Sequence, residues 1–175
     1  MSLGNVLMGD DALGPHVTAH LNARYEFPAE VQVEDLGTPG LDLHPFLAGH
    51  DVLILVDVVN SRGQAGELRL YRKDQILEHP PLPRVSPHDP GLKEALLGLQ
   101  FADEDPGEVY LVGVIPSETG KLEVGLSAPV RAAIPAAMAA VTEELDRLGY
   151  PARSRPQPLD PDIWWEKVAG EEGPA

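Results

Sequence analysis

The chain has 175 residues, of which 43% are hydrophobic and none is cysteine, and its formal net charge is −15. Because this charge opposes attraction to phosphate backbones and anionic lipid, neither nucleic acid nor a membrane surface is an expected partner. The lack of cysteine excludes disulfides, thiolate zinc sites and a thiol nucleophile, so any metal must be held by histidine and carboxylate side chains.

A chain of this length buries one core of ordinary size, so one domain is expected over residues 1–150. Residues 151–175 are rich in proline and acidic side chains and are predicted to form a loosely packed tail, docked through Ile163-Trp164-Trp165. No apolar run approaches the ~20 residues that span a bilayer, and no basic-then-apolar leader is expected. These features favour a cytoplasmic location.

The first regular element after an opening loop is predicted to be a helix. Residues 4–9 read as the loop, and Asp10 or Asp11 is expected to cap the helix that follows. Its apolar residues recur at every fourth position, as Leu13, Val17 and Leu21.

An alternating α/β chain should place a strand before that loop, yet only residues 1–3 precede it. Losing four or five strand residues that are buried on both faces would forfeit on the order of 5–10 kcal/mol. We therefore expect a truncated first strand. Either a slot remains beside the middle strand, or another segment fills it, such as one from a neighbouring chain.

The middle strand is predicted at residues 52–58, where apolar side chains lead up to Asp57. Such a run is typical of a parallel strand buried on both faces by helices. Residues 108–115 form a second strand of this kind. Two further strands are predicted, one near an edge at residues 31–36 and a half-exposed antiparallel one at residues 66–71.

Helices are predicted around these strands. A short one follows the tight turn at residues 37–40, another covers residues 92–99, and the longest runs from a cap at Ser127 to residue 148. Residues 79–90 contain five prolines and are predicted to be irregular. The pattern favours a three-layer, doubly wound α/β fold with a mostly parallel twisted sheet, one antiparallel strand and helices on both faces.

Three polar residues are predicted to meet at one edge of this sheet. Asp11 opens the first helix, Asp57 ends the middle strand, and His88 lies in the proline-rich loop. Strand ends and the helix starts that follow them share one rim of a doubly wound sheet. Two carboxylates and an imidazole suit one divalent ion such as Zn, Ni, Mn or Fe. Each residue also has a purely structural explanation, as a helix cap, a turn residue and an exposed loop histidine.

The other histidines are not expected to bind metal. His16 and His20 lie one helical turn apart, but they lack the glutamate of the zinc-protease pattern and are expected to flank the apolar stripe. Surface positions are expected for His44, His50 and His79.

Residues 4–14 read Gly-Asn-Val-Leu-Met-Gly-Asp-Asp-Ala-Leu-Gly. This segment resembles the Gly-Asn-x-Leu-x-x-Asp-(Asp/Glu)-x-x-Gly signature of the nickel-iron hydrogenase maturation endopeptidases, with Ala12 where a glycine commonly follows the acidic pair. The likeness covers roughly residues 4–148 in the family's order. It continues through residues 35–40, the strand ending at Asp57, and residues 86–88, 111–116 and 125–127.

The resemblance implies an endopeptidase, a hydrolase that removes the C-terminal extension of the nickel-iron hydrogenase large-subunit precursor after nickel has been inserted. Matched residue by residue, the family's metal-contacting acid corresponds to Asp11, its strand-end aspartate to Asp57 and its histidine to His88. These three form the expected catalytic and metal-binding set. The nickel is supplied by the substrate and serves as the recognition element, and Zn or Cd could replace it in a crystal.

The chain offers no obvious protein nucleophile, because it has no cysteine and no serine in a nucleophile elbow. This agrees with a metal-dependent mechanism of the aspartate/histidine type, in which the water-activating base stays unassigned. Gly37, Thr38 and Gly40 are candidates for binding the substrate backbone, although an ordinary turn explains them equally well.

Two other functions stay open. A non-catalytic nickel carrier or chaperone on the same scaffold would use the same three residues. A phospho-receiver signalling module would use Asp57 as its acceptor. The receiver pattern needs a lysine at the end of the last parallel strand, where residues 116–118 are Pro-Ser-Glu, and it gives no role to His88.

Overall fold

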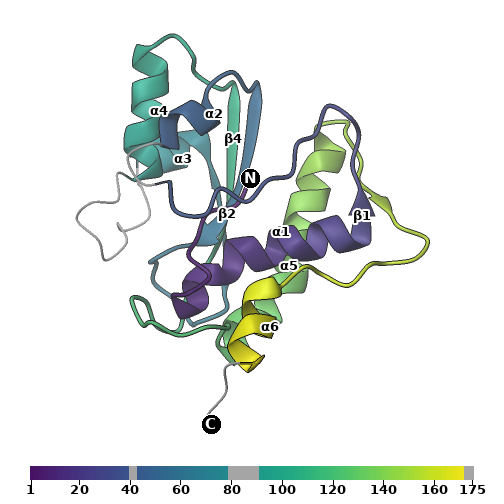
Figure 1. The fold of residues 1–175 in the computed structure, drawn as a ribbon. Coiled ribbons are helices and arrows are strands. Elements are labelled where there is room, and N and C mark those ends of the chain that lie inside the picture. The colour runs from purple at the N-terminus through teal and green to yellow at the C-terminus, as the bar shows by residue number, and fades with distance from the viewer. Residues whose placement is uncertain (40–42, 79–90, 172–175) are drawn as a thin grey trace.

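The computed structural model describes residues 1–39, 43–78 and 91–171, which form a mixed α/β fold (Figure 1). Its main sheet has the strand order β2–β4–β3. The strands are β2 (Val52–Val58), β4 (Glu108–Val114) and β3 (Leu68–Arg72). β2 and β4 are parallel, and β3 pairs with β4 in the antiparallel sense. The predicted α/β fold with one antiparallel strand is confirmed.

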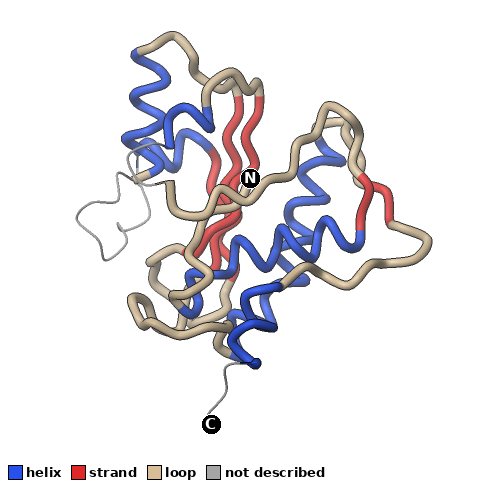
Figure 2. Tube along the Cα trace, in the orientation of Figure 1, coloured by secondary structure: helices blue, strands red, loops and turns tan. Residues whose placement is uncertain are grey.

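Helices lie on both sides of this sheet, as Figure 2 shows. On one side lie α1 (Leu13–Arg24) and α5 (Ala128–Arg147). On the other side lie α2 (His44–Leu47), α3 (Lys73–Glu78) and α4 (Leu92–Phe101). Within the described ranges, no helix is long and apolar enough to cross a membrane.

β2 is buried on both of its faces. Side chains of successive strand residues point to opposite faces, so Val56 and Val58 enter the core beneath α1 and α5. Leu53 and Leu55 enter the second core, beneath α2 and α4. The unbroken apolar run of β2 therefore reflects its central position, as predicted.

Residues 1–3 pair with β2 like a short parallel strand. Ser2 bridges in the parallel sense to Val56 on one side and to Asp35 on the other. The N–H of Leu3 donates to the carbonyl of Val56 at 3.0 Å, and the N–H of Val56 donates to the carbonyl of Met1 at 3.1 Å. Residues 1–3 thus lie between β2 and residues 34–36, paired with both.

The strand predicted at residues 31–36 is reduced to the single bridge of Asp35 with Ser2. An edge strand exists only where a neighbour pairs with its backbone, and residues 1–3 reach only residues 34–36. Residues 31–33 therefore form no strand, because residues 1–3 do not reach them to pair with their backbone.

The C-terminal segment is more regular than predicted. β5 (Arg153–Ser154) pairs antiparallel with β1 (Tyr25–Glu26). α6 (Trp164–Glu171) then packs against α1 through Trp165, which is 7% exposed and meets the His16 ring edge-on at 5.2 Å. The segment therefore packs on the body through Trp165, whereas Trp164 is exposed.

The predicted helix caps are wrong in detail. Ala12 occupies the N-cap of α1, and both aspartates lie before it in the 3-10 turn η1 (Gly9–Ala12). Ser127 does occupy the N-cap of α5, but its side chain makes no capping bond. Its hydroxyl donates instead to Oδ2 of Asp10 at 3.0 Å.

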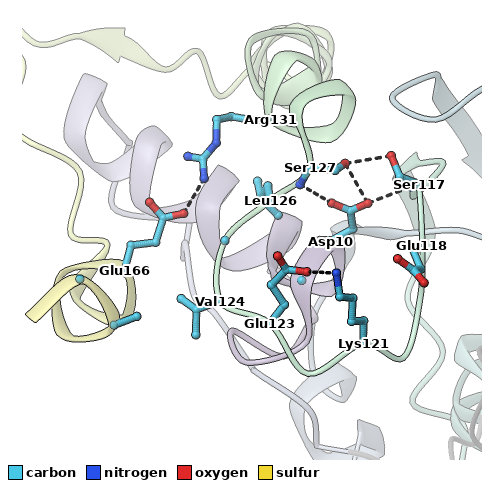
Figure 3. A pocket seen from close by; sticks show the side chains of 14 residues that line it. Asp10, Ser117, Glu118, Lys121, Glu123, Val124, Leu126, Ser127, Arg131 and Glu166 are labelled. Carbon is cyan, nitrogen blue, oxygen red and sulfur yellow. Dashed lines mark hydrogen bonds and ion pairs between the residues drawn. The ribbon is translucent and has the colours of Figure 1, made fainter. Parts of the chain in front are cut away.

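Asp10 ties the loop at residues 117–127 to η1. Its side chain is 4% exposed and accepts backbone N–H bonds from Ser117 at 2.8 Å and Ser127 at 2.7 Å, besides the Ser127 hydroxyl (Figure 3). A buried carboxylate is stable only when its oxygens accept such bonds. Asp10 therefore holds both ends of this loop.

A second buried acid clamps the sheet to α5. Glu144 is 5% exposed, and Arg72 of β3 donates to its two oxygens at 2.5 and 2.9 Å. Arg147 donates to Glu144 at 2.7 Å and also pairs with Glu108 of β4. Burial raises the pKa of Glu144, but the hydrogen bonds from the two arginines outweigh it and lower the pKa to about 2.

Replacing Glu144 by Gln should cost about 3 kcal/mol at pH 7, because two arginines lose their buried partner, and should lower Tm by roughly 6–12 °C. Folding lowers the pKa of Glu144, so its charged carboxylate stabilises the fold at pH values above its pKa in the unfolded chain. This stabilisation is lost as the pH falls toward 2. The Tm gap between the parent and Glu144→Gln should therefore narrow from pH 7 to pH 2.5. Glu143→Gln, at an exposed position of the same helix, is the matched control, and an equal loss in both variants would contradict the clamp.

Replacing Asp10 by Ala should release the loop, because three donors lose their acceptor at a cost of roughly 2 kcal/mol. Trypsin cleavage after Lys121, which lies in this loop, should accelerate at least about tenfold while global unfolding stays cooperative. Asp160→Ala, at an exposed position, serves as the control. Unchanged cleavage at Lys121 would mean that Asp10 does not hold the loop.

Candidate functional site

The C-terminal ends of β2 and β4 and the start of α1 lie at one end of the sheet (Figure 1). β2 brings Asp57 to this rim, and η1 contacts β2 and brings Asp11. Open α/β sheets bind ligands at this position, because the strand ends and the following loops converge there. The rim is therefore the candidate site.

The Gly4-Asn5 pair explains how Asp11 is oriented. Gly4 has φ +145°, and a Cβ at this position would lie 1.9 Å from the backbone oxygen of Asp11, so only glycine fits. This close approach lets the N–H of Asn5 donate to Oδ2 of Asp11 at 2.8 Å. The first two residues of the sequence motif thus have a physical role in placing the half-buried Asp11 carboxylate.

Asp57 is oriented in a similar way. Its side chain is 9% exposed, and Oδ1 accepts the N–H of Val58 at 2.7 Å. Its neighbour across the ladder is Gly113 of β4, where a Cβ would lie 2.6 Å from a methyl group of Val59. The chain therefore keeps a glycine beside the carboxylate, and one backbone donor fixes the carboxylate rotamer.

His88 and Gly40 lie outside the described residues, so the predicted metal set of Asp11, Asp57 and His88 stays a prediction. In the part of the chain that the structure describes, no group of three or more His, Cys, Asp or Glu side chains is arranged to hold a metal ion.

The turn predicted to bind substrate lies beside the first loop. The carbonyl of Gly37 accepts the N–H of Gly4 at 2.9 Å, and the N–H of Gly37 donates to Asp35 at 3.2 Å. Gly37 has φ +60°, and Thr38 is exposed next to it. The turn therefore lies close to the acidic loop, while its part in substrate binding stays a prediction.

A cavity of about 540 Å³ lies beside the rim, between the 117–127 loop and α6 (Figure 3). Charged side chains surround it, with Arg131 bound to Glu166 and Lys121 bound to Glu123, each at 2.6 Å. The sequence interpretation missed this cavity because α6 was not predicted. It also missed the loop-holding role of Asp10, whose partners lie more than 100 residues away and leave no local signal.

His16 is a core residue rather than a ligand at the rim. It is fully buried, and its Nε2 lies 3.3 Å from Glu166 of α6. Burial lowers the pKa of His16 to about 4 and also lowers the pKa of His20, so both are neutral at pH 7. His44 and His50 are half-buried, and His79 lies outside the described residues.

The chain is similar to known proteins in both sequence and structure. The chain matches a family model described as hydrogenase maturation protease over residues 15–144. It is 34% identical over 155 residues to hydrogenase 2 maturation protease of Escherichia coli K12. This match covers 89% of this chain and 94% of that protein. The hydrogenase expression/formation protein HoxM of Azotobacter vinelandii is 32% identical over 89% of this chain and 75% of its own.

Solved structures agree. The hydrogenase maturating endopeptidase HybD from E. coli has a TM-score of 0.78 at 32% identity, over 87% of this chain and 94% of that chain. The solution structure of an endopeptidase from E. coli has a TM-score of 0.77 at 33% identity, over 88% and 97%. Since the family model spans most of the chain and these relatives match along nearly their whole length, the chain belongs to the hydrogenase maturation protease family.

Proposed function

We propose that this protein removes the C-terminal extension of a nickel-iron hydrogenase large-subunit precursor after nickel insertion, and that the precursor's nickel is the recognition element. The observation that carries the proposal is the pair of strand-end and loop carboxylates, Asp57 and Asp11, each with one oxygen oriented by a backbone N–H at the rim. Membership of the maturation protease family supplies the reaction class.

Two carboxylates at one rim make a site that selects a cation. Carboxylates attract cations, so a precursor that presents a divalent ion gains attraction that an empty precursor lacks. His88 is the proposed third ligand, and its neutral imidazole suits nickel. Discrimination between loaded and empty precursor then follows from electrostatics rather than from reading the peptide sequence.

The residues of this chain act by binding and orienting. Asn5 and Val58 hold the two carboxylates through backbone donors, so little side-chain freedom is lost when a cation arrives. Nickel that arrives with the precursor supplies Lewis acidity toward a carbonyl or a water molecule. The exposed Thr38, beside the acidic loop, is the proposed contact for the precursor backbone.

Asp11→Asn, Asp57→Asn and His88→Ala should each reduce precursor processing at least about 100-fold, because each removes one proposed metal ligand. Tm should change little, since removal of a rim ligand opens no cavity in the core. Processing is measured by mass spectrometry of the large subunit, with His50→Ala as a histidine control. Normal processing by any of the three variants would remove that residue from the site.

Nickel-loaded and nickel-free precursor should differ sharply as substrates. We expect cleavage of the loaded form only, with at least about 100-fold weaker processing of the empty form, because only the loaded form presents a cation to the carboxylates. The gel mobility of the large subunit reports the result. Equal cleavage of both forms would contradict recognition through nickel, and binding of the loaded form without cleavage would favour a nickel carrier.

A further inference from the structure

α6 forms one wall of the cavity beside the rim, and few contacts hold it to the body of the protein. Of the side chains described in this helix, Trp165 alone is buried, whereas Trp164 and Val168 are 57% and 48% exposed. Glu166 pairs with Arg131 of α5 at 2.6 Å and lines the cavity (Figure 3). One aromatic side chain and one ion pair to an arginine therefore dock α6.

The segment before α6 is a hinge. The N–H of Leu159 donates to the carbonyl of Ala23 in α1 at 2.9 Å, which ties the chain to the body. Within the described chain, residues 160–163 make only a local backbone bond, from Ile163 to Pro161 at 3.0 Å. Backbone pairing with the body thus ends at Leu159, so α6 can leave its place without disturbing β5.

The contact that docks α6 contains unpaired polar atoms. His16 is fully buried against Trp165, with ring centroids 5.2 Å apart. No described residue forms a hydrogen bond with either ring nitrogen of His16 or with Nε1 of Trp165. Nε2 of His16 lies 3.3 Å from Glu166, but not in hydrogen-bond geometry. Because a buried donor or acceptor without a partner is unfavourable, these atoms oppose docking.

The free energy that holds α6 closed is therefore small. Burial of Trp165 favours docking, whereas the unpaired nitrogens oppose it and regain hydrogen bonds to water when the helix leaves. A helix of eight residues also has little stability away from the surface on which it packs. Opening of α6 should consequently be a local event, in which the sheet and α5 stay folded.

We propose that α6 is a latch over the cavity, which undocks locally at Trp165 and admits an extended peptide. Gly9 and Asp10 of η1 border the same cavity, and η1 also carries Asp11. A polypeptide held at Asp11 therefore has its neighbouring residues beside α6. The volume of about 540 Å³ lies within the range of roughly 300–1,000 Å³ that is usual for ligand sites.

The two parts of the inference have different foundations. The latch follows from the contacts of α6 alone. The identity of the peptide as the extension of the hydrogenase precursor rests on the proposed function. Separate measurements therefore test the two parts.

Hydrogen exchange of the full chain tests the latch. Protection factors of the α6 amides should be at least about 100-fold lower than those of α5. His16→Phe removes the unpaired nitrogens and keeps a ring against Trp165, so it should raise the protection of α6 at least about fivefold. His16→Met is a second apolar variant, and His20→Phe, one turn along α1, is the control that should change nothing.

Two results would overturn the latch. One is equal protection of α6 and α5 in the parent, which would mean that α6 opens only when the whole protein unfolds. The other is unchanged or lower protection of α6 in both His16 variants, which would mean that the histidine does not oppose docking.

The pH dependence of opening is an independent arm. Glu166 of α6, Arg131 of α5 and His20 of α1 face His16, and burial lowers the pKa of His16 from its ordinary value of 6.5 to about 4. The closed latch holds His16 neutral, so its stability is complete above pH 6.5 and is lost as the pH falls toward 4. Protection of α6 should fall at least about fivefold from pH 7 to pH 5. An equal fall in His16→Phe would overturn the part of His16 in the latch.

A processing assay tests what the latch admits. His16→Phe, whose latch is held closed, should process nickel-loaded precursor at least about fivefold more slowly than the parent, while His20→Phe keeps the parental rate. Equal rates for His16→Phe and the parent would overturn entry of the extension past α6. Loss of processing in every protein, the parent included, would contradict the proposed function and with it the admission of the extension, whereas the exchange data decide the latch separately.

Discussion

The parallel pairing of residues 1–3 is the contact on which the arrangement of the rim depends. These residues are hydrogen-bonded to Val56 of β2 and to residues 34–36, so three segments far apart in the sequence are fixed side by side. Directly after these residues comes the Gly4-Asn5 loop, whose Asn5 N–H orients Asp11. One short strand fragment thereby places the acidic loop, the Gly37 turn and the end of β2 at the same edge.

The two neighbouring aspartates of the motif have divided roles. Asp10 is buried and binds Ser117 and Ser127, which fixes the loop after β4. Asp11 is the next residue of the 3-10 turn, and its Oδ2 accepts the N–H of Asn5. The two neighbouring acids therefore hold different parts of the chain, Asp10 the loop after β4 and Asp11 the Asn5 backbone, and their substitutions should have different consequences.

The elements that could be predicted from sequence are those whose signal is local. β2 and β4 are unbroken apolar runs, α5 keeps helical spacing over 20 residues, and the alternation before Arg72 indicates the half-exposed β3. α6 is short and follows a proline-rich stretch, so its stability depends on the contact of Trp165 with His16 rather than on its own sequence. Ser127 was correctly predicted at the N-cap of α5, but neither its side chain nor that of Asp10 caps a helix, because the two bind one another across the fold.

Hydrogen-bonding side chains connect α1 to the turn at the rim through residues 1–3. A hydrogen-bonded chain runs from Thr18 of α1 through Ser2 to Asp35 and on to the N–H of Gly37, with distances of 2.9, 2.9 and 3.2 Å. This chain of hydrogen bonds holds Ser2 between α1 and Asp35. The position of the Gly37 turn therefore depends on α1 as well as on the backbone pairing, while backbone donors beside the rim carboxylates orient Asp11 and Asp57.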